Sequence, residues 1–190
     1  MMKLWYAAQP ASTRIARLMC YEMEVEVEEC LVDLENENHR QSLLAIGINK
    51  LPALQIQEAP GYFSLLPDIA EYLGTLVSPE RRLIPWDSEG GFEVRRWIYY
   101  VGNLVGTPIG LLELREEDSD CRKLLSGSLP ALEARLTDQE YMAGDRFSLA
   151  DCALGVYLAA YRAKAKWESE YPQLAAYLRR FQLRTAVRRL

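Results

Sequence analysis

The stretch Tyr141-Met142-Ala143-Gly144-Asp145-Arg146-Phe147-Ser148-Leu149-Ala150-Asp151 contains the start of an apolar helix. Ser148 suits the N-cap position, and Asp151 follows three residues later, where its carboxylate can accept a hydrogen bond from the backbone N–H of the cap residue. The negative charge of the same carboxylate is also stabilised by the positive end of the helix dipole. Because residues 147–161 are strongly apolar, we predict a helix there that lies at the centre of the protein.

Further helices are predicted on both sides of this stretch. Apolar residues at helical spacing between positions 94 and 105 indicate one helix, which Pro108 should end or kink. Leucines between positions 124 and 136 indicate another, interrupted at Pro130. Residues 171–181 indicate the last helix. The chain from residue 92 to residue 190 is therefore expected to be all helical.

The first 75 residues alternate between strand and helix patterns. A strand at 4–7 precedes a helix that has Ser12 as its predicted N-cap. A second strand within 25–34 and a weak helix around 41–45 complete a parallel β-α-β unit and its next helix. Strands at 53–56 and 62–65, joined by a turn at 58–61, indicate a hairpin, and a helix runs from Pro67 to Gly74. The predicted order is βαβαββα for domain 1–75, followed by a linker at 76–91 and a helical domain at 92–190.

Composition places the chain among ordinary globular proteins, with 49% hydrophobic residues, 26% charged residues and a formal net charge of −5 over 190 residues. An acidic balance disfavours nucleic acid or an anionic membrane as the partner. No apolar stretch approaches the roughly 18 residues that a membrane span requires, and no signal peptide is apparent. The cysteines form no CxxC pair, and His39 lies in a polar run expected to be a solvated loop, so we predict a cytoplasmic protein with reduced thiols and no metal site.

Four segments together carry a family resemblance. They are Lys50-Leu51-Pro52-Ala53-Leu54, Tyr72-Leu73, the stretch 141–151 quoted above, and Tyr171-Pro172-Gln173-Leu174-Ala175-Ala176-Tyr177-Leu178. In order and spacing they resemble the glutathione S-transferase superfamily, in particular bacterial-type members. The resemblance implies a thioredoxin-like first domain, a helical-bundle second domain, glutathione as cosubstrate and a homodimer.

The resemblance also implies where glutathione would bind. In the family the peptide bond before the proline matching Pro52 is cis, and it aims the backbone of the preceding residue, here Leu51, at the cysteinyl part of glutathione. Lys50 is a candidate for a glutathione carboxylate, with a surface role as the alternative. The family's acidic residue and serine at the third helix correspond to Leu65-Leu66, so Ser64 is the nearby polar substitute.

The thiol-activating group of the family has no clear counterpart. The positions of its catalytic serine or cysteine fall within residues 7–11, where only the Gln9 amide is polar. Ser12 and Tyr6 are the remaining candidates, and each has a structural alternative, Ser12 as a helix cap and Tyr6 as a packing residue. On the first helix of the second domain, Tyr99, Tyr100 and Asn103 are candidates for an electrophile pocket.

Two functions follow from these residues. One is a glutathione transferase-like enzyme that conjugates or isomerises a small apolar electrophile through a glutathione thiolate. The alternative is a non-catalytic protein of the same fold that has lost glutathione binding and binds a partner or a small ligand. The altered residues at the thiol and at the third helix favour the alternative, whereas the Leu51-Pro52 turn favours the enzyme.

Overall fold

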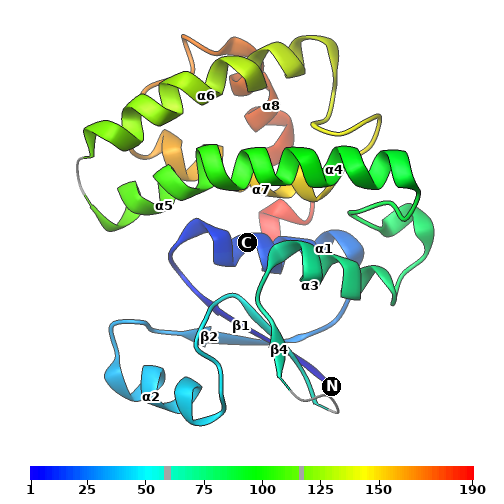
Figure 1. Cartoon of the computed structure of the whole chain (residues 1–190), viewed down its shortest axis with the longest axis vertical. Coiled ribbons are helices and arrows are strands. Elements are labelled where there is room, and N and C mark those ends of the chain that lie inside the picture. Colours follow the sequence, from blue (N-terminus) through cyan, green and yellow to red (C-terminus); the bar gives the residue numbers. More distant parts are fainter. Residues whose placement is uncertain (58–60, 116–117) are drawn as a thin grey trace.

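The computed structural model describes residues 1–57, 61–115 and 118–190 (Figure 1). Most of the predicted turn at 58–61 lies outside these residues. The first elements are β1 (Met2–Ala7), α1 (Ala11–Met23), β2 (Glu28–Val32), α2 (Glu37–Ala45), β3 (Ala53–Ile56), β4 (Tyr62–Phe63) and α3 (Leu66–Gly74). The helical part contains α4 (Ser88–Val101), α5 (Thr107–Leu114), α6 (Ser119–Asp138), α7 (Leu149–Arg162) and α8 (Pro172–Gln182).

Within the described residues the strands form one sheet in the order β2-β1-β3-β4, with β1 parallel to β2 and antiparallel to β3. Side chains alternate across the sheet, so Leu4 packs with α1 and α3 on one face while Trp5 packs with Leu43 of α2 on the other. Figure 1 shows α2 on the side of the sheet away from the helical part. The sheet and its helices form a thioredoxin-like unit, in the predicted order βαβαββα.

Helix α7 forms the centre of the helical part, since every residue from 149 to 158 is buried. The predicted capping box is present. Asp151 accepts hydrogen bonds from the Ser148 backbone N–H at 3.0 Å and from the Met142 N–H at 2.9 Å. The sequence therefore predicted both the start of this helix and its central place.

Helix α1 joins the two parts because it packs against β1 and α3 on one side and against α7 on the other (Figure 1). Arg184, which follows α8, donates two hydrogen bonds to the Glu22 carboxylate of α1, at 2.6 and 2.7 Å. The Leu149 N–H donates to Leu83 C=O at 3.0 Å. These contacts fix the thioredoxin-like unit against the helices.

Three local predictions were wrong. Ser12 is not the N-cap of α1, because the helix already begins at Ala11 and Pro10 occupies the cap position. Pro130 does not interrupt α6, because it faces solvent while Leu125 and Leu129 keep the opposite face buried. His39 lies in α2 and not in a loop, although it is exposed, and its Nδ1 accepts the Asp33 N–H at 3.2 Å.

Two prolines mark other helix starts. Pro108 lies in the first turn of α5, directly after one turn of π-helix at Gly102–Gly106 that separates α4 from α5. Pro67 lies in the first turn of α3, whose N-cap is Leu65. Helix α4 begins at Ser88, within the segment 76–91 that was expected to be a linker.

Candidate functional site

The loop between β1 and α1 forms one wall of the candidate site. Ala7 ends β1 and Ala11 begins α1, and the N-cap residue Pro10 makes no side-chain hydrogen bond to this helix. Thr13 is fully buried, and its Oγ1 lies 2.5 Å from Ala7 O and 2.9 Å from Pro10 O. Its hydroxyl proton is therefore shared by the loop carbonyls, and the hydroxyl holds the loop rather than facing a ligand.

A carboxylate from the helical part caps α1 instead. Glu113 of α5 accepts the Ala11 N–H through Oε2 at 2.8 Å, across 102 positions of sequence. Its side chain is only 6% exposed, and the guanidinium of Arg14 lies 3.8 Å from its Oε1. A negative charge at the N-terminus of α1 interacts favourably with the helix dipole. Because Glu113 belongs to α5, this contact also joins the two parts of the protein.

Beside Glu113 lies a cavity of about 340 Å³, which we call the interdomain cleft. Pro10, Ala11 and Ser12 line it from the start of α1. The facing wall contains Gly102, Gly106 and Gly110 together with Leu111, Leu114 and Tyr157. A Cβ at Gly106 would lie 2.4 Å from the Tyr157 ring, so the absence of a side chain there lets Tyr157 reach this wall.

The thiol candidates lie in different places. Ser12 lines the interdomain cleft, whereas Gln9 lines a neighbouring groove of about 440 Å³ together with Leu31, Leu34 and Leu114. Tyr6 lines neither cavity. Its ring packs below the guanidinium of Arg17, with 4.6 Å between the guanidinium carbon and the ring centroid.

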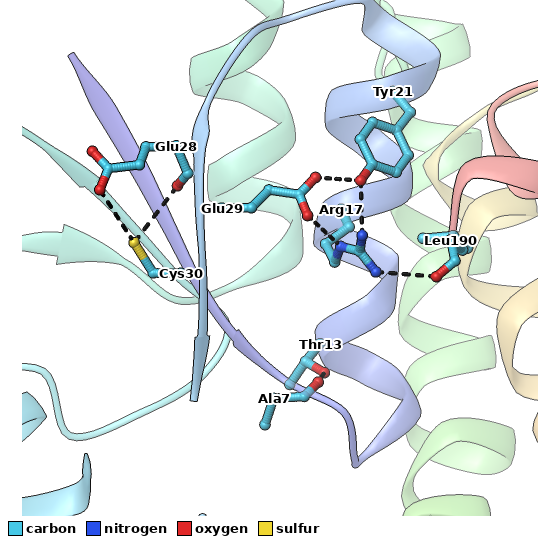
Figure 2. A network of polar contacts seen from close by, with 8 residues as sticks. All are labelled: Ala7, Thr13, Arg17, Tyr21, Glu28, Glu29, Cys30 and Leu190. Atoms are coloured by element: carbon cyan, nitrogen blue, oxygen red, sulfur yellow. Dashed lines mark hydrogen bonds and ion pairs between the residues drawn. The ribbon is translucent and has the colours of Figure 1, made fainter. Parts of the chain in front are cut away.

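Arg17 is the centre of a polar network that sequence reasoning missed (Figure 2). It donates to Glu29 at 2.9 Å, to the Tyr21 hydroxyl at 2.8 Å and to the backbone C=O of Leu190 at 3.2 Å. Tyr21 in turn donates to Glu29, and its pKa is raised by burial and by that carboxylate. The Arg17 guanidinium and the Glu29 carboxylate neutralise each other. Because Arg17 and Tyr21 belong to α1 and Glu29 belongs to β2, the network joins these two elements.

The glutathione-contact candidates come from β3 and its flanks. The Leu51-Pro52 bond is cis, and no described residue hydrogen-bonds to the backbone N–H or C=O of Leu51. Lys50 is exposed just before it, and Ser64 lies one residue before the α3 N-cap. That cap is Leu65, which is 51% exposed and offers no polar group. None of these residues lines the interdomain cleft as described.

The three pocket candidates on α4 and the π-turn point in two directions. Tyr100 turns toward α6, where its hydroxyl donates to Ser128 C=O at 3.0 Å. Tyr99 is 61% exposed, and Asn103 is exposed on the π-turn. Arg95 pairs with Glu71 of α3, and Tyr99 lies four residues after Arg95, so Tyr99 shares the α4 face nearest the first domain.

Glu113 and Tyr157 are the cleft residues that sequence reasoning did not find. Glu113 follows an apolar run on α5, and Tyr157 belongs to the buried centre of α7, so each resembles an ordinary structural position. Within the described ranges, no group of His, Cys, Asp and Glu side chains could hold a metal ion. No helix among those residues has the length and apolarity of a membrane span.

Comparison with known proteins agrees with this architecture. Residues 110–180 match the family model described as glutathione S-transferase, C-terminal domain. Comparison with curated protein sequences finds no match. A thioredoxin-like sheet unit followed by this helical domain defines the glutathione transferase fold.

Solved structures extend the likeness over the whole chain. A glutathione S-transferase from Methylobacillus flagellatus KT with glutathione bound shares 24% identity and a TM-score of 0.85, covering 100% of this chain and 98% of that one. A glutathione transferase from Methylococcus capsulatus Bath shares 25% identity and a TM-score of 0.82, with 100% and 96% covered. A glutathione S-transferase from Methylobacterium radiotolerans, in complex with glutathione sulfonate, shares 22% identity and a TM-score of 0.78, covering 99% of this chain and 93% of that one. The chain therefore has the glutathione transferase fold, and residues 110–180 match the C-terminal domain of that family.

Proposed function

We propose that this protein binds a small ligand in the interdomain cleft and does not activate a glutathione thiol. The observation that carries the proposal is the Glu113 carboxylate, which takes the Ala11 N–H at the start of α1. A thiolate needs hydrogen-bond donors or positive charge nearby. Residues 7–11 supply no hydroxyl or thiol, and the first donor of α1 already holds an anion.

The other end of the expected glutathione site supports the same conclusion. The N-cap of α3 is an exposed leucine, Leu65, and Leu66 follows it. A charged amino-acid group placed there would lose water without gaining a side-chain partner from these two residues. Of the two positions where this fold would recognise glutathione most specifically, one is thus apolar and the other is already occupied by the Glu113 carboxylate.

The test is to titrate the protein with glutathione by calorimetry and to measure conjugation of 1-chloro-2,4-dinitrobenzene. We expect no saturable, glutathione-dependent rate above the uncatalysed reaction. A matched Glu113→Gln variant keeps an amide oxygen for the Ala11 N–H while removing the charge, so it should bind glutathione more tightly than the wild type. Saturable conjugation by the wild-type protein would refute the proposal.

A second candidate is conjugation or isomerisation of a small apolar electrophile by a glutathione thiolate. Two features favour it: the backbone of Leu51 has no hydrogen-bond partner among the described residues, and Ser12 lines the cleft. In that case Ser12→Ala should abolish the rate if Ser12 holds the sulfur, and Tyr6→Phe should do so if Tyr6 does. The neighbours with glutathione or glutathione sulfonate bound support a search for this activity.

We also propose a cytoplasmic homodimer. Phe92 and Tyr99 on α4 are 63% and 61% exposed, and large apolar side chains of this kind favour a covered face. The cysteines are free thiols, which suits a reducing compartment. Sedimentation equilibrium of the wild type and of a Phe92→Glu variant tests the dimer, because the charge should shift the protein to monomer.

A further inference from the structure

Residues 179–189 concentrate positive charge on an otherwise acidic protein. This segment contains five arginines and no aspartate or glutamate, whereas the whole chain carries a formal net charge of −5. Two of the arginines lie in the last turn of α8, and two more lie in a short 3₁₀ turn, Val187–Arg189. A segment of this kind produces a local positive potential unless nearby carboxylates neutralise it.

The fold neutralises only part of this charge. Arg184 pairs with the Glu22 carboxylate of α1 through two hydrogen bonds. Arg180 donates to the backbone C=O of Glu140 at 3.1 Å, and this neutral acceptor leaves the positive charge of the guanidinium in place. The ion pair with Glu22 therefore compensates one arginine of the segment.

Three further arginines of the segment, all exposed, have no carboxylate partner in the described part of the chain. The side chains of Arg179 and Arg188 make no hydrogen bond or ion pair with those residues. The Arg189 guanidinium lies over the Tyr21 ring, with 4.2 Å between the guanidinium carbon and the ring centroid. Stacking of this kind orients a guanidinium and leaves the N–H groups in its plane available to an anion.

An exposed apolar side chain lies among these arginines. Leu183 is 67% exposed, and it follows Arg179 by four residues, so the two side chains lie on the same side of the helix end. Leu183 also lines a groove of about 490 Å³, together with Tyr21, Ala186 and Arg189. The surface therefore combines positive charge with an apolar contact and a groove beside it.

The carboxylates near the groove restrict what can bind there. Glu22 and Glu24 line the groove, but each is already paired, Glu22 with Arg184 and Glu24 with Arg81. A long polyanion such as nucleic acid would extend past the arginines toward Glu24 and Glu26, which are both exposed, and like charges would repel it. A short anionic segment avoids this repulsion.

We propose that Arg179, Leu183, Arg188 and Arg189, together called the basic surface, bind a short acidic segment of a partner protein that carries an apolar residue between its carboxylates. The carboxylates pair with the three arginines, whose planar N–H groups suit carboxylate oxygens. The apolar residue contacts Leu183 at the groove. The groove shares no lining residue with the interdomain cleft, so this proposal is independent of the proposed function.

Fluorescence anisotropy with labelled peptides tests the proposal. The probe is a peptide of sequence EELEELEE, and its matched controls are QQLQQLQQ, which lacks the charge, and EESEESEE, which lacks the apolar residues. We expect the wild type to bind EELEELEE more tightly than either control. Its affinity should fall at least about threefold between about 50 and about 300 mM NaCl, because salt screens exposed charges. Equal binding of EELEELEE and QQLQQLQQ would overturn the proposal.

A pair of double variants tests which charges are responsible. Arg179→Gln with Arg188→Gln should weaken EELEELEE binding by about two- to thirtyfold, the range of two exposed ion pairs. Lys123→Gln with Lys166→Gln removes the same charge from two exposed lysines outside the basic surface and should bind as the wild type does. Equal binding by the wild type and the arginine double variant would contradict the proposal.

Two further measurements separate the acidic segment from other occupants. Leu183→Ser should weaken binding of EELEELEE but not of EESEESEE, whereas the same loss for both peptides would exclude the apolar contact. Single-stranded oligothymidylate that binds more tightly than EELEELEE, and loses affinity in the arginine double variant, would assign the surface to nucleic acid. A change of oligomeric state in that variant, measured by sedimentation equilibrium, would assign the surface to a second copy of the chain. Either result would overturn the proposal.

Discussion

Replacing Asp151 with alanine should destabilise the protein by about 3–4 kcal/mol. Asp151 is fully buried and receives hydrogen bonds from the Met142 N–H at 2.9 Å, the Ser148 N–H at 3.0 Å and the Ser148 hydroxyl at 2.7 Å. Alanine leaves the two backbone donors buried without partners, and each such group costs about 1–3 kcal/mol. Tyr177 keeps one partner, because its hydroxyl also donates to the Asp151 backbone C=O at 3.1 Å.

The assay is urea and thermal unfolding followed by circular dichroism. For a chain of this size, 1 kcal/mol lowers the melting temperature by about 2–4 °C, so the expected decrease is about 6–16 °C. Asp145→Ala is the matched control, since Asp145 is an exposed aspartate in the same loop and should change stability by less than about 0.5 kcal/mol. A loss below 1 kcal/mol for Asp151→Ala would refute the reasoning that the carboxylate holds these donors.

Three further outcomes are expected. Gly155→Ala should lower the melting temperature far more than Gly127→Ala does, because a Cβ at Gly155 would lie 2.3 Å from the Phe181 ring whereas a Cβ at Gly127 would meet nothing within 4 Å. Equal melting temperatures of the two variants would contradict this. In the native protein, a thiol reagent at pH 8 should modify the partly exposed Cys30 first and Cys152 last, because Cys152 is fully buried and burial raises the pKa of its thiol well above the usual value; peptide mapping that finds Cys152 labelled before Cys30 would contradict this. The free energy of unfolding should fall as the pH rises from 9 toward 12. Burial raises the pKa of Cys20 and of Tyr177 in the folded protein, so unfolding releases their protons and becomes more favourable at high pH. Urea midpoints that stay constant over this pH range would exclude the effect.

Local chemistry allowed most of the fold to be predicted from the sequence. The Ser148 and Asp151 pair lies three residues apart, so the capping box was predictable without any tertiary contact. Pro130 was misjudged because its effect depends on which face of α6 points to solvent, and that is a tertiary property. The Ser12 prediction failed because the preceding Pro10 takes the cap position.

The candidate site was less predictable, for a related reason. Its defining contact joins Ala11 to Glu113, two residues that no local pattern connects. Tyr157 was hidden in an apolar helix, and only the missing side chain of Gly106 brings its ring to the cleft wall. The lack of the family's polar residues at 7–11 and at Leu65 was visible in the sequence, so these differences were easier to predict than the contact between Ala11 and Glu113.

The position of α1 between the sheet and α7 has a consequence for protein engineering. A chimaera that joins the first domain of one relative to the second domain of another, cut anywhere within residues 76–91, would carry α1 away from the α7 surface that it fits. The same cut would separate Glu22 from Arg184 and Ala11 from Glu113. A functional chimaera should therefore take the α1 residues that face α7 from the same relative as the helical domain. The residues that must be exchanged together are thus not contiguous in the sequence.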